Sequence, residues 1–282
     1  MFLNLWRAEW LKTRRRPANL GILAVMILLV VGITLIWAFY ALSQGKTSEE
    51  AVEALQAFAF PGAISFSLMI IGGLGWILGI IFMANSVGSE YSRDTWKMIL
   101  PRQGSRIAFV LVKLLIGLAF MALLIVLTMV AAQIAGWLGV LLLGGSFTST
   151  EAFSLSAFFQ SLVPILMQIV LFACVTLVAA VVTRSSIGGI VIGFVAYVVF
   201  NLAAISTIAA RIVPTTHLDN LNIHWLYGSL PADVQTMMRE QMTDTFGMEI
   251  SVTTSLLVVL GYVVGCVALA LFMFKNRDMA GQ

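Results

Sequence analysis

Residues 20–42 read LGILAVMILLVVGITLIWAFYAL, a stretch that contains no charged side chain. A helix of about 20 apolar residues crosses the ~30 Å hydrocarbon core of a bilayer. Lipid offers the backbone no hydrogen-bond partner, and the alternating pattern of a barrel strand is absent, so the stretch is predicted to be helical. The apolar part of a signal peptide has only about 7–15 residues, so this segment is interpreted as a retained anchor.

Five more apolar runs follow. Hydrophobic residues make up 60% of the chain and charged residues 10%, whereas soluble domains carry about 25% charged residues. The sequence therefore predicts an all-α polytopic membrane protein, with six transmembrane helices in a single transmembrane domain, 1–282. The third run is expected to be tilted or broken near 136–139, and a tight helical hairpin is expected at 183–186. The six expected spans are 20–42, 61–87, 107–143, 156–183, 187–211 and 252–274.

Lysine and arginine are distributed unevenly among the segments that join the spans. Thirteen of the 16 lie in alternate segments: the N-terminus, 88–113, the hairpin turn and the C-terminal tail. The positive-inside rule assigns these segments to the cytoplasm, which predicts that both termini are cytoplasmic. Nine of the 13 acidic residues lie on the opposite, outer side.

The longest segment between spans, 212–250, is predicted to be an outer loop. Within it, residues 231–246 carry apolar side chains at helical spacing, among them Val234, Met238 and Met242. This pattern predicts an amphipathic helix before span six, lying on the membrane surface or packed on the spans. Two interpretations stay open for it: a lid that covers the spans, or a gate over a substrate exit.

The sequence contains no nucleotide-binding or catalytic motif. Residues 44–47 read QGKT and resemble the end of a P-loop, but Tyr40 stands where the motif requires glycine. His217 and His224 lie in the predicted outer loop, and the absence of an HExxH motif disfavours a metalloprotease. We therefore expect that the chain is not an enzyme and binds neither a cofactor nor a metal ion. Cys174 and Cys266 lie inside apolar runs and are expected to act as apolar fillers.

The spans are expected to carry no charged side chain at depth. Ion-driven transporters usually need such groups, so a transport function would take its energy from elsewhere. Gln168 and Asn201 are the main polar residues inside the spans. Each is expected either to hydrogen-bond between helices or to line a substrate path. Glycine pairs four residues apart, at 75/79, 189/193 and 261/265, predict close helix packing within one chain or between two chains.

The N-terminal segment 1–19 is predicted to be an interfacial helix that leads into span one. Its aromatic residues Trp6 and Trp10 mark one helical face, and the segment also carries Glu9 and Lys12. A helix of this kind lies along the membrane surface. Contact with anionic lipid is one interpretation, and contact with a protein partner is the other.

The segment 88–106 is dense in charges of both signs. Mixed charges with aromatic residues on a short helix suit a protein–protein contact, in which the aromatics anchor and the charges set the register. A solvated interfacial loop is the alternative. Pro101 ends the predicted helix. The residues expected at the contact are Glu90, Tyr91, Arg93, Asp94, Thr95, Trp96 and Lys97.

Three short motifs stand in order against the six spans. The first is EWLKTRR at 9–15, and the last is FKNRD at 274–278. The middle motif consists of Glu90, Tyr91, Thr95, Leu100, Pro101, Arg106 and Lys113. Together they resemble the permease subunits of bacterial ABC-2-type ATP-binding-cassette exporters over nearly the whole chain. The family patterns are E-x-x-K-x-R-R, E-Y-x-x-G-T-x-x-x-L…P…R…K and F-x-x-R-D. Asp94 departs from them, because it stands where the family often has glycine.

This resemblance implies a permease subunit that couples ATP hydrolysis on a separate subunit to efflux of a drug, a peptide or a lipid-like substrate. Residues 88–104 would contain a coupling helix seated on the ATPase subunit, and the N-terminal helix would touch the same subunit. The outer loop, 212–250, would supply re-entrant or capping helices. Two permease chains, as a homodimer or with a sister permease, would join two ATPase chains that hold ATP and Mg²⁺. The expected location is the bacterial plasma membrane, with lipids as further partners and no nucleic acid.

Two other classes of function stay open. A membrane scaffold or immunity protein would bind a partner and transport nothing. A neighbouring gene for a P-loop ATPase would favour the exporter over this class. An intramembrane hydrolase would need a serine brought together with histidine or lysine at membrane depth.

Overall fold

The computed structural model describes residues 2–92, 106–148, 153–226, 236–237, 240 and 250–276. Six of the described helices are long and apolar enough to cross a membrane, which confirms the predicted six-span, all-α fold. Among the described residues no strand is formed, and the one β-bridge joins Phe60 to Thr148. The spanning helices are α2 (Pro17–Gln44), α4 (Gly62–Ser92), α6 (Arg106–Leu143), α7 (Leu155–Thr183), α8 (Ser186–Ala203) and α12 (Val252–Asn276).

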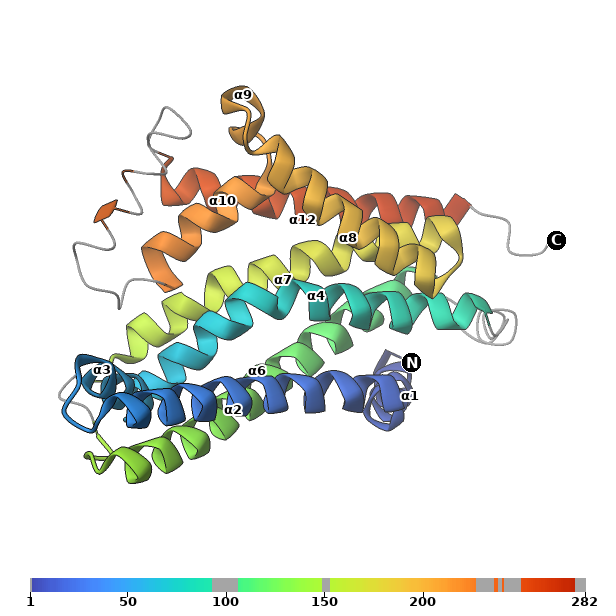
Figure 1. Ribbon diagram of the computed structural model, residues 1–282. Coiled ribbons are helices and arrows are strands. Elements are labelled where there is room, and N and C mark those ends of the chain that lie inside the picture. The colour runs from blue at the N-terminus through green and yellow to red at the C-terminus, as the bar shows by residue number, and fades with distance from the viewer. Residues whose placement is uncertain are drawn as a thin grey trace.

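The spans run side by side, with the connecting segments gathered at two ends (Figure 1). At one end lie α1 (Phe2–Arg15), the C-terminal end of α4, the α7–α8 turn and the end of α12. We call this the α1 end. The opposite, α3 end carries the short helix α3 (Glu49–Phe58). All segments predicted to be cytoplasmic therefore join the spans at the same end.

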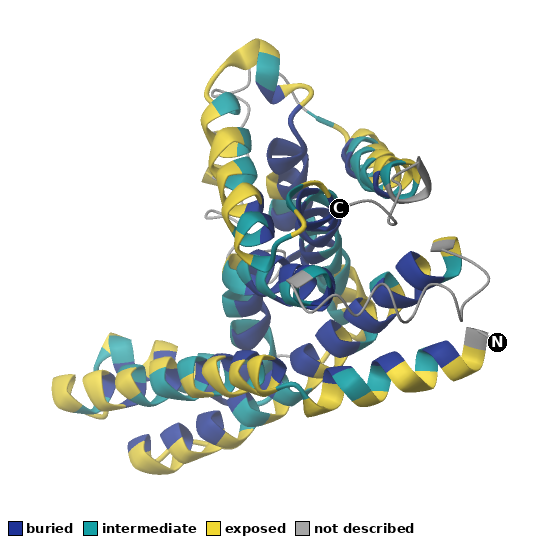
Figure 2. Cartoon of the chain, turned by 90° about the vertical axis from the view of Figure 1, so that its right-hand side faces the viewer, coloured by how far each residue is buried: buried dark blue, intermediate teal, exposed yellow. Residues whose placement is uncertain are grey.

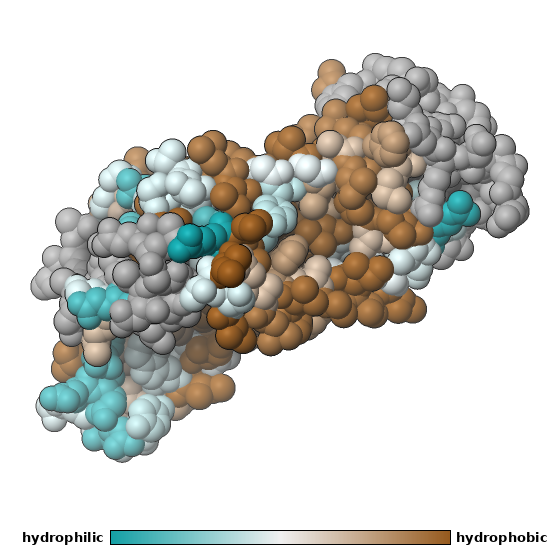
Figure 3. Space-filling view, turned by 90° about the horizontal axis from the view of Figure 1, so that it is seen from above, coloured by the Kyte–Doolittle hydropathy of each residue, from teal (hydrophilic) through white to brown (hydrophobic). Residues whose placement is uncertain are grey.

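Helices α4 and α7 form the centre of the bundle. Their most apolar stretches are 61% buried, whereas those of α8 and α12 are 11% buried. Figure 2 shows that the outer helices bear long exposed stripes, and Figure 3 shows an apolar surface along the middle with hydrophilic residues toward the ends. In a bilayer, apolar side chains on such a surface face lipid, so their exposure costs nothing.

Two expectations about the helices are corrected or resolved. The third run forms one unbroken helix, α6, so the predicted alternative of a break near 136–139 is wrong. Figure 1 shows α6 crossing the bundle obliquely. Span five was expected to reach 211, but α8 ends at Ala203. The chain then turns through α9 (Thr207–Ala210) and packs on α12 as α10 (Pro214–Leu221), which continues into the π-helical turn η2 (Asn222–Leu226).

The helix α3 was not predicted from the sequence. Ser48 caps its N-terminus by accepting a hydrogen bond from the Ala51 backbone N–H at 3.1 Å, and acidic residues occupy its first turn. Its apolar face, including Ala54 and Phe58, is buried against α2 and α6. The cap and the apolar spacing are the sequence signals that could have found it. The predicted amphipathic helix at 231–246 lies mostly outside the described residues and stays a prediction.

Two of the three glycine pairs pack inside the chain, as predicted. A Cβ atom at Gly79 would lie 2.9 Å from the Ile169 carbonyl oxygen, and one at Gly193 would lie 2.5 Å from Thr176 Oγ1. In contrast, Gly261 and Gly265 face open space. The absence of a side chain therefore brings α4 onto α7 and α8 onto α7, whereas the pair on α12 has no such role among the described residues.

The predicted hairpin between α7 and α8 is present. Arg184 ends α7 in the left-handed region with φ 53°, and Ser185 caps α8 by accepting from the Gly188 N–H. The first residues of α8 then lie directly against Gly88 of α4.

We predict that Gly88→Ala destabilises the protein. The new Cβ would lie 2.3 Å from the Ser186 backbone nitrogen, so the start of α8 must move. Overpacking of this kind typically costs about 1–3 kcal/mol. Gly73→Ala on the same helix meets nothing within 4 Å and is the matched control. Thermal unfolding of the detergent-solubilised variants, monitored by size-exclusion chromatography, measures the difference. Equal midpoints for the two variants would contradict the packing described.

Candidate functional site

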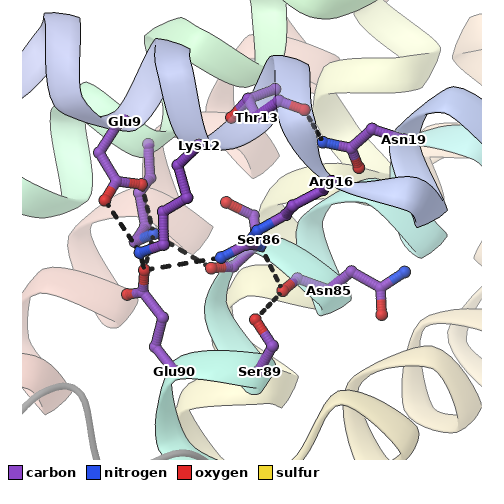
Figure 4. A network of polar contacts seen from close by, with 10 residues as sticks. Glu9, Lys12, Thr13, Arg16, Asn19, Asn85, Ser86, Ser89 and Glu90 are labelled. Carbon is purple, nitrogen blue, oxygen red and sulfur yellow. Dashed lines mark hydrogen bonds and ion pairs between the residues drawn. The ribbon is translucent and has the colours of Figure 1, made fainter.

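Charged residues from three helices meet in the interior at the α1 end. Glu9 and Lys12 come from α1, Glu90 comes from the last turn of α4, and Lys113 comes from the second turn of α6. We call these four residues the ion cluster. Figure 4 shows the carboxylate groups of Glu9 and Glu90 pointing toward the Lys12 side chain.

The ammonium group of Lys113 is the centre of the cluster. Its Nζ lies 2.8 Å from Glu9 Oε2 and 2.9 Å from Glu90 Oε1, and it donates to the Ser86 carbonyl oxygen at 3.0 Å. An ammonium group has three donors. Two hydrogen bonds, to Glu9 and to the Ser86 carbonyl oxygen, and the ion pair with Glu90 therefore bind α6 to both α1 and α4.

Lys12 closes the cluster from the side of α1. Its Nζ lies 3.2 Å from Glu9 Oε1 and also pairs with Glu90. The guanidinium group of Arg16 lies 3.8 Å from Glu90 Oε1 and donates to the Asn85 carbonyl oxygen at 2.9 Å. Two carboxylates and two ammonium groups thus balance, with a third cation at the edge.

The turn between α1 and α2 directs these side chains inward. Arg16 is extended, as expected for a residue that precedes proline, and Pro17 begins α2. Asn19 reinforces the turn by donating to the Thr13 carbonyl oxygen at 2.8 Å. Figure 1 shows α1 nearly end-on while α2 lies along the bundle, so α1 runs across the end of the spans.

The cluster is enclosed by apolar and aromatic side chains. Glu90 and Lys113 are each 1% exposed, and Glu9 is 6% exposed. Leu5, Trp6 and Trp10 of α1 pack in the same layer as Phe109, whose ring centroid lies 4.7 Å from Lys113 Nζ. Electrostatic attraction is stronger in a low-dielectric site of this kind, but so is the penalty for leaving one member unpaired.

The ionised form of Glu9 is favoured despite its burial. Burial raises the pKa of Glu9, but the charges of Lys113 and Lys12 together outweigh it and hold the pKa below its ordinary value of 4.5. A carboxyl group with a lowered folded-state pKa stabilises the fold above its unfolded pKa, and this stabilisation is lost as the pH falls through the folded pKa. The contribution of Glu9 is therefore complete at neutral pH.

The interfacial helix predicted at 1–19 corresponds to α1, and its buried face contains a charged residue as well as the two tryptophans. Trp6 and Trp10 are half-buried and pack against the core, while Leu3 is exposed. Glu9 shares the buried face, because it has a partner there in Lys113. Charge on the apolar face of a helix is unusual, and it is the signal that could have indicated this cluster.

The predicted contact segment is described only at its start. Glu90 is buried in the ion cluster, and Tyr91 is half-buried against the same core. Arg93, Asp94, Thr95, Trp96 and Lys97 lie outside the described residues. Their expected contact with a partner stays a prediction, but Glu90 and Lys113 join the two helices that flank the segment 93–105.

The two polar residues expected inside the spans do not come together. Gln168 is half-buried in α7, whereas Asn201 is exposed on α8 and donates to the carbonyl oxygen of Tyr197 in the same helix at 2.8 Å. Their assignment to a substrate path stays a prediction.

A histidine–serine pair forms toward the other end of the bundle. His217 Nδ1 lies 3.2 Å from Ser255 Oγ, and His217 Nε2 lies 3.0 Å from the Arg211 carbonyl oxygen. Because a carbonyl oxygen only accepts, Nε2 carries the proton and Nδ1 accepts from the serine hydroxyl. Asn220 donates to the same Ser255 Oγ at 2.9 Å. Both members of the pair are at most 1% exposed, so the network has no open face for a substrate and joins α10 to α12.

The comparisons with known proteins agree with the motifs. Residues 5–201 match the family model described as ABC-2 family transporter protein. This range covers more than half of the chain and contains every member of the ion cluster. No curated protein matches the chain.

We predict that Lys113→Met destabilises the protein by about 3–5 kcal/mol, because two buried carboxylates would then share Lys12, with Arg16 only at the edge of the cluster. Adding Glu9→Gln to Lys113→Met restores the charge balance and should recover a large part of the loss. Lys46→Met, at an exposed position at the α3 end, is the control. Thermal unfolding in detergent measures all three variants. A Lys113→Met protein as stable as the control would show that the ion cluster does not hold the helices together.

Proposed function

The chain belongs to the ABC-2 family of transporter proteins, and we propose that it is the permease subunit of an exporter driven by ATP hydrolysis on a separate ATPase subunit. The observation that carries this proposal is the ion cluster. It joins α1, the end of α4 and the start of α6 around the segment 93–105, where the sequence predicts the ATPase contact.

The cluster supports a mechanism for transmitting motion. A push on 93–105 acts on the two helix ends that flank it, and the Glu90–Lys113 pair makes these ends move together. The Glu9–Lys113 pair carries α1 with them. Closure of an ATPase dimer would thus shift three helices as one body and change the packing of the spans, as in other switches built from rigid elements.

The distribution of charge supports an external energy source. Among the described residues of the six spans, the charged ones are Glu90, Arg106, Lys113 and Lys275, and all lie near the α1 end. A transporter driven by an ion gradient usually places such groups along the path of the ion. The proposal therefore assigns ATP and Mg²⁺ to the partner and leaves this chain without a catalytic role.

The proposed assembly has two permease chains and two ATPase chains in the bacterial plasma membrane. The substrate moved outward is a drug, a peptide or a lipid-like molecule. The permease role agrees with the six spans and the family match, while the substrate class rests on the family resemblance alone.

We predict that Asp94→Arg combined with Trp96→Ala reduces co-purification of the ATPase about tenfold or more, because charge and aromatic contacts dominate such interfaces. The tagged chain is isolated from its native membranes, and co-purifying chains are identified by mass spectrometry. Glu53→Arg with Phe147→Ala makes similar changes at the exposed α3 end and should have no effect. Unchanged ATPase in the Asp94/Trp96 variant would refute the assigned contact, and the absence of any P-loop ATPase would refute the exporter.

The proposal also requires the α1 end to face the cytoplasm. In a chain carrying Cys174→Ala and Cys266→Ala, a membrane-impermeant maleimide applied to intact cells should label Thr47→Cys. It should label Ser105→Cys only after the membrane is permeabilised, because the basic segments stay inside. The reverse pattern would place the predicted ATPase contact on the wrong side of the membrane.

A further inference from the structure

A cavity of about 310 Å³ lies between four of the spans, and its lining includes no member of the ion cluster or of the histidine–serine pair. Its floor is formed by α4 and α7, and its sides by α6 and α12; Figure 1 shows α7 between the latter two. The described residues that line it are all apolar, including Phe82, Met121 and Ile169. The cavity therefore offers no hydrogen bond to a ligand.

The depth of the cavity follows from its position along α6. Its lining runs from Leu111 to Met121, and α6 begins at Arg106. At about 1.5 Å per residue, the cavity lies roughly 8–22 Å along α6 from the α1 end. Because α6 crosses the bundle obliquely, the depth is smaller than this length. With the α1 end in the cytoplasm, the cavity therefore lies mainly in the cytoplasmic half of a core of about 30 Å.

The cavity opens at the outer surface of the bundle. Leu111, Leu115 and Leu118 of α6 line it and are 38%, 43% and 37% exposed, so this wall also forms part of the apolar exterior. Val263 and Val267 of α12 form the opposite side and are half-buried. A molecule dissolved in the bilayer can thus enter between α6 and α12 without crossing a polar surface.

Two glycines leave the space open for different reasons. A Cβ atom at Gly79 would lie 2.9 Å from the backbone oxygen of Ile169, so glycine is needed there for the contact between α4 and α7. For a Cβ atom at Gly117, the nearest atom is a ring carbon of Phe82 at 3.1 Å, and the three nearest atoms all belong to side chains. A larger residue at Gly117 therefore fills the cavity at the cost of a shift in one ring.

The chemistry of the lining decides which occupant fits. A peptide would bring backbone N–H and C=O groups that the lining cannot satisfy, and burial of such groups without partners is costly. A charged or hydrogen-bonding solute is disfavoured for the same reason. If the space stayed empty, the lining side chains would lose their dispersion contacts. A flexible hydrocarbon chain restores these contacts and requires no polar partner.

We propose that this cavity is a binding site for one acyl chain of a phospholipid from the cytoplasmic leaflet. The chain enters between α6 and α12 and lies on α4 and α7, while its headgroup stays at the membrane surface. Recognition is of the hydrocarbon alone, so phospholipids with different headgroups and equal chains bind alike. The proposal rests on the six spans and their orientation and does not depend on coupling to an ATPase.

The test uses a phospholipid with a photoactivatable diazirine in the middle of one acyl chain. The full-length protein is reconstituted in vesicles of phosphatidylethanolamine and phosphatidylglycerol that contain this probe, illuminated, digested and analysed by mass spectrometry. Labelling should concentrate on peptides that contain 111–121 and 263–267. Placing the same chain on a phosphatidylcholine headgroup should leave the pattern unchanged.

Two variants fill the cavity from different helices, in case one of them does not fold. Gly117→Phe acts from α6 and Ala173→Phe from α7, and either should reduce labelling of these peptides about tenfold. Leu123→Phe on the exposed face of α6, outside the cavity, is the matched control and should label like the unaltered protein. Labelling spread evenly over the lipid-facing helices, labelling unchanged in both filled variants, or labelling that depends on the headgroup would overturn the proposal.

Discussion

The pairing of Lys113 with Glu9 and Glu90 is the constraint on which the α1 end of the protein depends. The ammonium group of a lysine that is 1% exposed is stable only when its charge is balanced and acceptors lie within reach of its donors. Glu9, Glu90 and the Ser86 carbonyl oxygen meet both conditions. These acceptors come from α1 and α4. Separating either helix from α6 would therefore leave buried charges without partners in an apolar layer, which costs free energy.

The rest of the bundle is held by a different kind of contact. In lipid, apolar side chains gain little by turning inward, so helices associate through close packing of small residues and through polar contacts. Gly75 and Gly79 bring α4 onto α7, and Gly88 admits the start of α8. Away from the ends, Trp76 of α4 stacks on Tyr197 of α8 with ring centroids 3.5 Å apart. The interior is therefore a closely packed pair of helices, with looser helices arranged around it.

Tight and loose regions have separate roles in the proposed transport. In the proposed mechanism, the ion cluster would make α1, α4 and α6 respond together to an event at 93–105. Helix α12, in contrast, packs mainly on α7 and α10 and makes little contact with α6. The apolar cavity lies at this weak junction. A hydrocarbon chain in the cavity would fill the space between α4 and α6, which belong to the proposed moving unit, and α12, which does not. The lipid would then act as part of the packing of the spans.

Much of the fold could be predicted because the decisive signals are local. A bilayer requires about 20 apolar residues per helix, so hydropathy alone located six spans and the hairpin at 183–186. Local signals were weaker where the chain leaves the membrane. The helix α3 was missed there, although it is indicated by the cap at Ser48 and by the spacing of Ala51, Ala54 and Phe58. The end of α8 was placed too late because the residues after Ala203 remain apolar while the backbone turns.

The sequence by itself determined the membrane class, the number of spans and the motifs that resemble an ABC-2 permease, because hydrophobic length and residue order are properties of the chain alone. Only the tertiary structure decided that Glu9, Glu90 and Lys113 form one cluster, since they lie on three helices far apart in sequence and their charges had been counted as loop residues. It also decided which glycine pairs pack and where an apolar cavity remains. These features depend on how helices face one another, and in an apolar chain the periodicity of hydrophobic residues does not reveal which face is inside.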